Sequence, residues 1–453
     1  MGEGKRTGIE VRAKHAILVG VLIYGRERVE REPLDELRGL AETADVEIVG
    51  TLMQNRHHFD IKTFLGKGKV EELKQLIEET KADTVLFDSG LTPTQARNLE
   101  EALGVVIVDR NELILSIFLS HAKSHEARLQ VELAQLLYQR PRLKRMWTHL
   151  ERTEGAVGSR GPGEQQLETD RRLIDARVDE LRARLKEIEK RRELLVAQRH
   201  EHPTVSLVGY TNAGKSTLMN ALTGAGVYVA DQLFATLDTR TRTWHLPHWG
   251  DILLSDTVGF IRDLPHNLVT SFRSTLEEAR HADLLLHVVD SSHPAAEHQI
   301  QTVNEVLSEI GIDGSQAILV LNKCDAVTDL SQLNLLRPQG IETITVSART
   351  GQGIDSLAEA VKQRLSRGNL EVEIETSATN GRLHSYLAQH AELLSQDYAD
   401  SRMTYRCRIP RRYLDRIPRE DAQIQILEPE RLPSAALTAA PNGLDGAAHD
   451  AGS

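Results

Sequence analysis

The chain has 453 residues and a formal net charge of −11, with 40% hydrophobic and 27% charged residues. At ~150 residues per domain the length predicts about three domains, and the acidic balance excludes a protein that coats nucleic acid over its whole surface. No run of about 18 apolar residues appears, and the opening "MGEGKRTGIEVRAKH" lacks the apolar core of a signal peptide. We therefore expect a cytoplasmic protein without stable membrane insertion, peripheral membrane association at most. Its two cysteines, Cys324 and Cys407, exclude a disulfide framework and a cysteine zinc site.

The first part of the chain, residues 1–110, alternates buried strands with amphipathic helices. Helical spacing is found in "REPLDELRGLAETA", "KVEELKQLIEETK" and "TPTQARNLEEALG". Between them lie four apolar runs typical of buried strands: "AILVGVLIY" (16–24), "VEIVGTLMQ" (46–54), "TVLFDS" (84–89) and "VVIVD" (105–109). This alternation predicts a small parallel α/β domain.

Residues 111–200 show helical periodicity only, interrupted by the Gly-rich stretch "TEGAVGSRGPGEQQ" (153–166). A seven-residue stripe and the apolar face of the preceding helix predict an antiparallel helical hairpin with the Gly-rich stretch at its tip. The stripe consists of Leu167, Ile174, Leu181, Ile188 and Leu195, and the facing helix offers Val131, Leu133, Leu136 and Leu137. From Gln139 to His200, sixteen Lys/Arg face eleven Asp/Glu, a net +5, which suits either RNA phosphate or a solvated helix with internal ion pairs.

The βα alternation returns over residues 201–368 with five strand candidates: "TVSLVGY", "DILLSDT", "DLLLHVVD", "QAILVLNK" and "ETITVSA". For residues 369–430 the sequence predicts a small C-terminal α/β domain. Within it, residues 370–410 are expected to form a strand, a helix and a strand. The tail, residues 431–453, is rich in Pro, Ala and Gly and is expected to be disordered. The fold class is therefore multidomain α/β.

A phosphate-binding loop follows the strand "TVSLVG". The sequence "GYTNAGKS" fits G-x-x-x-x-G-K-[S/T] and precedes a helix, so its amides and the helix dipole can face phosphate oxygens. Lys215 is expected to reach the β- and γ-phosphates and the Ser216 hydroxyl to bind Mg²⁺. The nucleotide-binding residues of this loop are Gly209, Tyr210, Thr211, Asn212, Ala213, Gly214, Lys215 and Ser216.

The base is selected by "VLNKCD" and "VSAR". Asp325 can accept two hydrogen bonds from guanine N1 and N2, which adenine cannot offer, so the nucleotide is GTP. Asn322 is expected on the O6/N7 side, and the Ala348 N–H on O6. The full set around the base is Asn322, Lys323, Cys324, Asp325, Ser347, Ala348 and Arg349.

Two switch segments complete the predicted Ras-like G domain. In "LLSDTVGF", Asp256 is expected to hold Mg²⁺ through water and the Gly259 N–H to sense the γ-phosphate, with Thr257 and Val258 between them. In "DQLFATLDT" (231–239), Thr236 is the candidate ligand of Mg²⁺, with Thr239 as the competing choice. The first switch site comprises Phe234, Ala235, Thr236, Leu237 and Asp238. Lys215, Thr236 and Gly259 would serve catalysis, and Ser216, Thr236 and Asp256 the metal.

These motifs together resemble the HflX family of ribosome-associated GTPases over nearly all the chain except its tail. The resemblance lies in "FLGKGKVEEL" (64–73), "RNELILSIF" (110–118), "RLQVELAQLLYQRPRL" (128–143), "GSRGPGEQQLE" (158–168) and "GYTNAGKSTLMNALT". It implies a GTPase that binds the large ribosomal subunit and its rRNA, splits or rescues stalled ribosomes and acts under stress. We also expect a monomer, without DNA as a partner.

The position that carries a water-orienting glutamine in small GTPases is Phe260 here. The family shares a hydrophobic residue at this position, so the resemblance implies an active enzyme whose water is oriented by backbone, metal or a partner. Asn212 resembles the asparagine of potassium-activated GTPases, although a residue that tolerates the tight loop is an equal reading.

Other segments keep several interpretations. "GKGK" (66–69) fits an anion site for ATP or RNA phosphate, or an ordinary basic helix start. The tip "GSRGPGE" fits an RNA contact or a hairpin turn. Two rival functions also stay open: a GTP-gated enzyme of RNA modification, which needs a second catalytic site such as a reactive cysteine, and a GTP-regulated binding switch in ribosome assembly.

Overall fold

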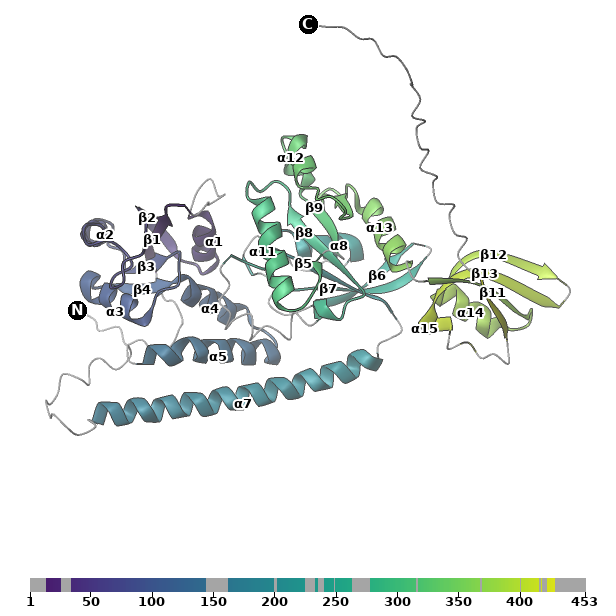
Figure 1. The fold of residues 1–453 in the computed structure, drawn as a ribbon, viewed down its shortest axis with the longest axis horizontal. Helices are drawn as coiled ribbons and strands as arrows, with labels where there is room; N and C mark the ends of the chain where they lie inside the picture. The colour runs from purple at the N-terminus through teal and green to yellow at the C-terminus, as the bar shows by residue number, and fades with distance from the viewer. Residues whose placement is uncertain are drawn as a thin grey trace, which may run out of the picture. The chain divides into compact units, whose positions relative to one another are not determined.

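The computed structural model (Figure 1) describes residues 14–25, 34–143, 162–198, 202–224, 233–234, 240–247, 249–262, 278–314, 317–366, 369–399, 401–414, 417 and 422–427. They fall into two compact units, one up to Leu365 and one from Ser366 onward. No helix among these residues is long and apolar enough to cross a membrane.

The first unit begins with a parallel four-stranded sheet in the order β2-β1-β3-β4. Its elements are β1 (His15–Ile23), α1 (Asp35–Thr43), β2 (Glu47–Arg56), α2 (Lys67–Thr80), β3 (Thr84–Phe87), α3 (Pro93–Leu103) and β4 (Val106–Asp109). Alternate residues of β1 face opposite sides: Ile17 and Val19 pack with α2 and α3, whereas Ala16 and Leu18 pack with α1 and the following helix α4. The predicted parallel α/β domain is confirmed.

Helices α4 (Arg110–His121), α5 (His125–Gln139) and α7 (Pro162–Gln198) follow, with the short 3-10 helix η1 (Arg140–Arg142) after α5. α4 begins directly at the end of β4 because the Asp109 side chain caps it, accepting the Glu112 N–H at 2.9 Å. Arg110 therefore lies at the carboxyl edge of the parallel sheet, where the polar ends of the strands meet.

The predicted helical pair is formed by α5 and α7, which lie side by side (Figure 1). Their contact is apolar, and the ion pairs Arg140–Asp175 and Arg177–Glu132 show that the helices run antiparallel. The seam consists of Leu129, Leu133, Val178 and Leu181, flanked by Leu136, Leu137, Ile174, Leu185 and Ile188. The assignment of Val131 to this seam is wrong, because its side chain belongs to the core that α5 shares with α4, on the other side of the helix. The side chains of Leu167 and Leu195, and the Gly-rich tip through residue 161, lie outside the described residues.

The G domain has a six-stranded sheet in the order β10-β9-β8-β5-β7-β6, parallel except for β6. Its elements are β5 (Thr204–Gly209), α8 (Lys215–Thr223), β6 (Arg240–Leu246), β7 (Gly250–Asp256), β8 (Leu284–Asp290), α11 (Ala296–Glu309), β9 (Ile318–Asn322), η3 (Cys324–Ala326), α12 (Leu330–Leu335), β10 (Thr343–Thr345) and α13 (Ile354–Ser366). Five strands match the sequence candidates. β6 was missed, because "RTRTWHL" is an edge strand whose buried residues include only Trp244 and Leu246.

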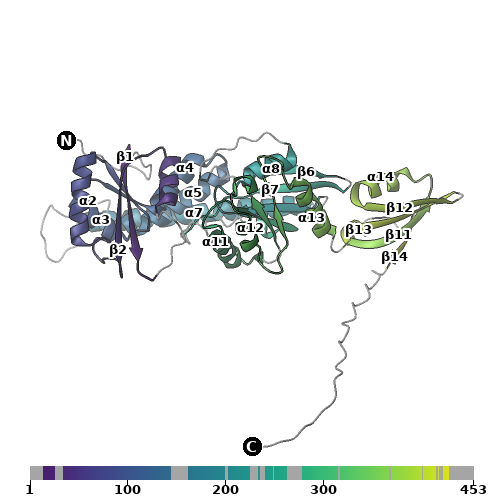
Figure 2. The same ribbon diagram turned by 90° about the horizontal axis from the view of Figure 1, so that it is seen from above.

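The second unit is an antiparallel sheet in the order β12-β13-β11-β14, with α14 on one face (Figure 2). It comprises β11 (Asn369–Ser377), α14 (Gly381–His390), β12 (Glu392–Ala399), β13 (Arg402–Pro410), α15 (Arg411–Leu414) and β14 (Ala422–Leu427). The strand–helix–strand reading of 370–410 was therefore too simple. Cys407 is fully buried, and burial raises the pKa of its thiol to about 12, so it is a packing residue rather than a nucleophile.

Candidate functional site

The phosphate-binding loop lies where β5 ends and α8 begins, and two of its glycines are required by close backbone approach. Gly209 has φ +153°, and a Cβ there would lie 2.2 Å from the carbonyl oxygen of Val288 on the neighbouring strand. Gly214 has φ +88°, and its Cβ would lie 2.4 Å from Asn322 Nδ2. Any larger residue would push the loop away from β8 or from the base-binding segment.

Lys215 is 7% exposed at the start of α8. Its Nζ donates to the carbonyl oxygens of Gly209 at 3.1 Å and Tyr210 at 2.8 Å, which hold the ammonium over the loop. Burial lowers the pKa of Lys215 to about 8, although Asp256 acts in the opposite direction. The charged form of such a buried amine is strongly stabilised by a neighbouring anion such as a phosphate.

A magnesium site fits beside this lysine. The Ser216 hydroxyl donates to Asp256 Oδ2 at 2.6 Å, and Asp256 ends β7 almost fully buried. These are hard oxygen donors, and Mg²⁺ is usually held by one or two protein groups together with water and phosphate oxygens. The two described residues of the predicted metal set are thus adjacent and fit this ion.

The two predicted base-binding segments meet through Asn322. Its Nδ2 donates to the Ala213 carbonyl at 2.9 Å, and its Oδ1 accepts the Ala348 N–H at 3.0 Å. Asn322 thus ties the phosphate loop to the "VSAR" segment, while its contact with guanine stays a prediction. Lys323 pairs with Asp290 at 2.7 Å, and Asp325 is exposed in η3, as a base-binding carboxylate requires.

The second switch segment is fastened to the phosphate loop. The Phe260 N–H donates to the Gly209 carbonyl at 3.1 Å, and the Thr211 N–H donates to the Phe260 carbonyl at 2.7 Å. Gly259 therefore lies so close that a Cβ would be 3.0 Å from Lys215 Nζ. The Phe260 side chain is 2% exposed and belongs to the apolar core shared with α1 and α4, so it contributes nothing polar to the site.

Of the first switch segment the structure describes Leu233 and Phe234. The Leu233 N–H donates to the Thr43 hydroxyl at 3.2 Å, and the Phe234 ring packs edge-on against Phe118 at 4.6 Å. The Phe234 side chain thus faces α4, and its predicted contact with nucleotide would have to come from the backbone. The remaining predicted positions, Ala235, Thr236, Leu237 and Asp238, and the competing Thr239, lie outside the described residues.

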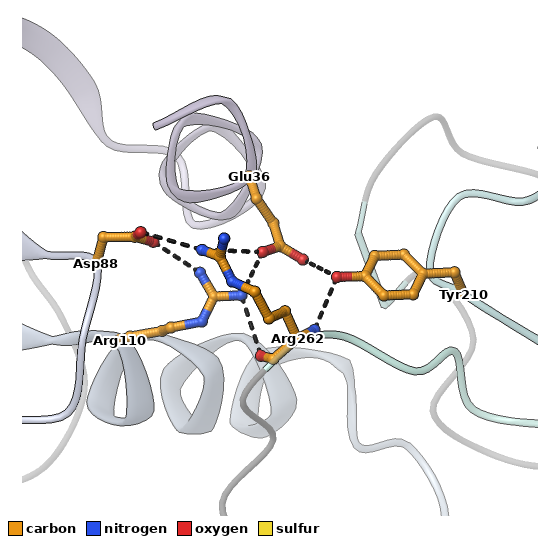
Figure 3. Close-up of polar contacts among 5 residues, drawn as sticks. All are labelled: Glu36, Asp88, Arg110, Tyr210 and Arg262. Atoms are coloured by element: carbon orange, nitrogen blue, oxygen red, sulfur yellow. Dashed lines mark hydrogen bonds and ion pairs between the residues drawn. The ribbon is translucent and has the colours of Figure 1, made fainter. Parts of the chain in front are cut away.

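Sequence reasoning missed a buried polar cluster beside the phosphate loop (Figure 3). Arg110, 1% exposed, bonds Asp88 at 2.9 Å and Glu36 at 2.7 Å. Arg262 bonds Asp88 at 3.0 Å, and the Tyr210 hydroxyl bonds Glu36 and accepts the Arg262 N–H at 2.7 Å. The only sequence signal was the position of Asp88 and Arg110 at the carboxyl ends of β3 and β4.

This cluster balances its charges, two arginines against two carboxylates. Burial alone would raise the pKa of Glu36, but Arg110 and Arg262 outweigh burial and lower it. Burial and the Glu36 charge raise the pKa of Tyr210, which keeps its proton. Glu36 is therefore an anion that accepts, and Tyr210 a neutral hydroxyl that donates.

Three family profiles match consecutive parts of the chain. They are described as GTP-binding GTPase N-terminal (residues 31–119), GTP-binding GTPase Middle Region (121–199) and 50S ribosome-binding GTPase (204–323).

The chain is also similar over most of its length to curated proteins. It is 48% identical to GTPase HflX of Magnetococcus marinus over 363 residues, covering 79% of this chain and 83% of that protein. It is 43% identical to GTPase HflX of Caldanaerobacter subterraneus over 398 residues, covering 87% and 91%. Among solved structures, a GTP-binding protein of Sulfolobus solfataricus in complex with GDP is 26% identical, with a TM-score of 0.43, covering 78% of this chain and 99% of that one.

Proposed function

This chain belongs to the HflX family of GTPases and hydrolyses GTP, and from that premise we propose that it acts on the ribosome. We propose that it binds the large (50S) subunit and its rRNA and splits or rescues stalled ribosomes under stress. The description of the family that matches residues 204–323, a 50S ribosome-binding GTPase, supports this proposal. We further propose that the protein is a cytoplasmic monomer, as its sequence predicts.

The observation that carries the proposal is the position of Phe260. Its side chain lies in an apolar core and both of its backbone groups bond the phosphate loop, so it offers no group to orient water. Hydrolysis by the isolated protein should then be slow, on the order of 10⁻⁴–10⁻² s⁻¹, as for GTPases that await a partner. Docking on the large subunit would supply or order the missing group.

Within the site, each predicted residue has a proposed task. Lys215 and the Gly259 N–H bind the γ-phosphate, and Ser216, Asp256 and Thr236 hold Mg²⁺, which offsets charge on the transferring phosphoryl group. Water attacks in line, and no side chain is proposed as the base. GTP would order the first switch segment and bind the second, which is already bonded to the phosphate loop, through the Gly259 N–H. This state would favour docking, and hydrolysis would release the protein.

Potassium is a further proposed cofactor. Asn212 has φ +60°, so its backbone is left-handed, which fits a residue chosen for the tight loop. The other role, a side-chain carbonyl that helps to hold K⁺, is proposed from the resemblance to potassium-activated GTPases. GTP hydrolysis measured in KCl and in NaCl distinguishes them, because equal rates would discard the potassium role.

The proposal is tested by steady-state GTP hydrolysis with the isolated protein alone, with large subunits and with small subunits. We expect strong stimulation by the large subunit only. Absence of stimulation, with GTP still bound, would instead favour a GTP-regulated switch for another RNA or protein. Deleting residues 155–164 tests the hairpin tip: subunit binding that stays unchanged would refute its proposed RNA contact.

Ribosome splitting should be measured with GTP and with a non-hydrolysable analogue. Splitting by both would show that binding performs the work and that hydrolysis resets the protein. A requirement for hydrolysis in splitting itself would contradict the release role proposed above.

A further inference from the structure

The Tyr210 hydroxyl connects the N-terminal domain to the second switch segment. It donates to a carboxylate oxygen of Glu36 on α1 and accepts the backbone N–H of Arg262 at 2.7 Å (Figure 3). Glu36 and Tyr210 are 174 positions apart in the chain. One phosphate-loop side chain therefore joins an element outside the G domain to the segment that senses the γ-phosphate.

The bond to Arg262 extends a continuous attachment of the switch to the phosphate loop. Phe260 already exchanges two backbone hydrogen bonds with Gly209 and Thr211, and the Tyr210 hydroxyl adds a third bond two residues further on. These bonds hold Gly259 against Thr211 and Lys215, where a Cβ would lie 2.8 Å from Thr211 Cα. Gly259 and Lys215 are thus kept together by contacts within the protein itself.

Glu36 decides which way the hydroxyl points. A phenol has one hydrogen, so donation to Glu36 leaves an oxygen lone pair for the Arg262 N–H. The other Glu36 oxygen accepts from Arg110 at 2.7 Å, and Arg110 also donates to the Arg262 carbonyl at 3.3 Å. Both backbone groups of Arg262 are therefore bonded to groups that Glu36 orients.

We propose that Tyr210 is a positioning residue for GTP hydrolysis, with its hydroxyl set by Glu36 of the N-terminal domain. It acts through the backbone of Arg262, which keeps Gly259 preorganised beside Lys215 for the γ-phosphate. Preorganised donors raise the rate of the chemical step because they need not be assembled during it. The G domain without Glu36 would lack this fixed arrangement.

The test substitutes Tyr210→Phe in the full-length protein and compares it with Tyr138→Phe. Tyr138 belongs to the same apolar core, and its hydroxyl lies 3.4 Å from Glu112. Its polar and ring partners among the described residues are Glu112, Asp109 and Arg142, none of them in the phosphate loop or the second switch segment. Both variants lose one buried hydroxyl. Single-turnover GTP hydrolysis gives the rate of the chemical step, and nucleotide titration gives the affinity.

For Tyr210→Phe we expect the hydrolysis rate to fall about tenfold, the factor associated with one hydrogen bond, with GTP affinity changed less than twofold. Tyr138→Phe should keep the wild-type rate even if its melting temperature falls. Hydrogen exchange gives an independent reading: amides of residues 257–262 should exchange faster in Tyr210→Phe and not in Tyr138→Phe.

Glu36→Asp keeps the negative charge beside Arg110 but shortens the carboxylate, and its rate should fall in the same direction. A Tyr210→Phe rate equal to or above wild type would overturn the proposal, whether or not exchange at 257–262 accelerates. An equal fall of the rate in Tyr138→Phe would also overturn it, because the effect would then follow from core stability.

Discussion

GTP binding should be coupled to uptake of a proton by Lys215. Burial lowers the pKa of this amine to about 8, with Asp256 acting in the opposite direction. The phosphates of GTP bring negative charge next to the ammonium, so the complex favours the protonated lysine. Above about pH 8 the amine must therefore gain a proton before it can bind phosphate as a cation.

The size of the effect follows from linkage. With a pKa of about 8, roughly three-quarters of Lys215 is protonated at pH 7.5 and roughly one-quarter at pH 8.5. GTP affinity should therefore fall about threefold between these values, and proton uptake on binding should rise from ~0.25 to ~0.75. Because the pKa of Lys215 is lowered into this range, GTP binding weakens as the pH rises. Lowering the pH does not weaken binding through Lys215, because the amine is then already protonated.

The assay is titration calorimetry of GTP binding at pH 7.5 and 8.5, each in two buffers that differ in ionisation enthalpy. The control is Lys215→Arg, because a guanidinium stays protonated throughout this range. Equal proton uptake at the two pH values in the wild type would refute the reasoning. So would an equal rise in Lys215→Arg, since the proton would then be bound by another group or by the nucleotide.

Three further substitutions test individual contacts. Arg110→Met leaves two buried carboxylates with one arginine fewer, and the unfolding free energy measured in urea should fall by about 3–5 kcal/mol; a loss under ~1 kcal/mol would contradict the buried cluster. Gly214→Ala must shift Asn322 and strain a φ of +88°, so equilibrium titration should show GTP affinity at least ~tenfold weaker, and unchanged affinity would disprove the close approach. Burial, followed by the Lys215 charge, lowers the pKa of His287 to about 4. Below pH ~6.5 the unfolded chain therefore binds more protons than the folded one, and the free energy of unfolding decreases as the pH is lowered. His287→Gln should remove about 2 kcal/mol of the stability lost between pH 7 and 5, and identical losses in variant and wild type would show that His287 titrates normally.

The sequence predicted the elements whose signal is local. The strands β1, β3, β5, β8 and β9 are apolar runs buried on both faces, as parallel strands covered by helices must be. The phosphate loop and the "NKCD" segment are also local strings, and the structure joins them through Asn322. A motif of this kind can be recognised because its glycines and polar groups must occupy fixed positions in one short segment.

The rest depended on contacts between segments far apart in the chain. Tyr210 was assigned for its backbone, and nothing near it in sequence indicates that its hydroxyl meets Glu36. Val131 fits the helical period of the α5 seam, yet the same residue lies in the core on the other side of that helix. A helix packed between two neighbours has two apolar faces, and periodicity alone does not assign a residue to one of them.

The packing of the N-terminal domain explains why the glutamine position is Phe260. This side chain lies in one continuous core with Phe118 of α4, Phe234 of the first switch segment and Ile261. A glutamine there would bury an amide that needs hydrogen-bond partners, at a cost that an aromatic ring does not incur. The apolar residue that attaches the switch to the N-terminal domain is therefore the same residue that removes the water-orienting group from the site. Fixing the switch and orienting the water are thereby assigned to different parts of the molecule, the first to the N-terminal domain through Glu36 and Tyr210, the second to backbone, metal or a partner.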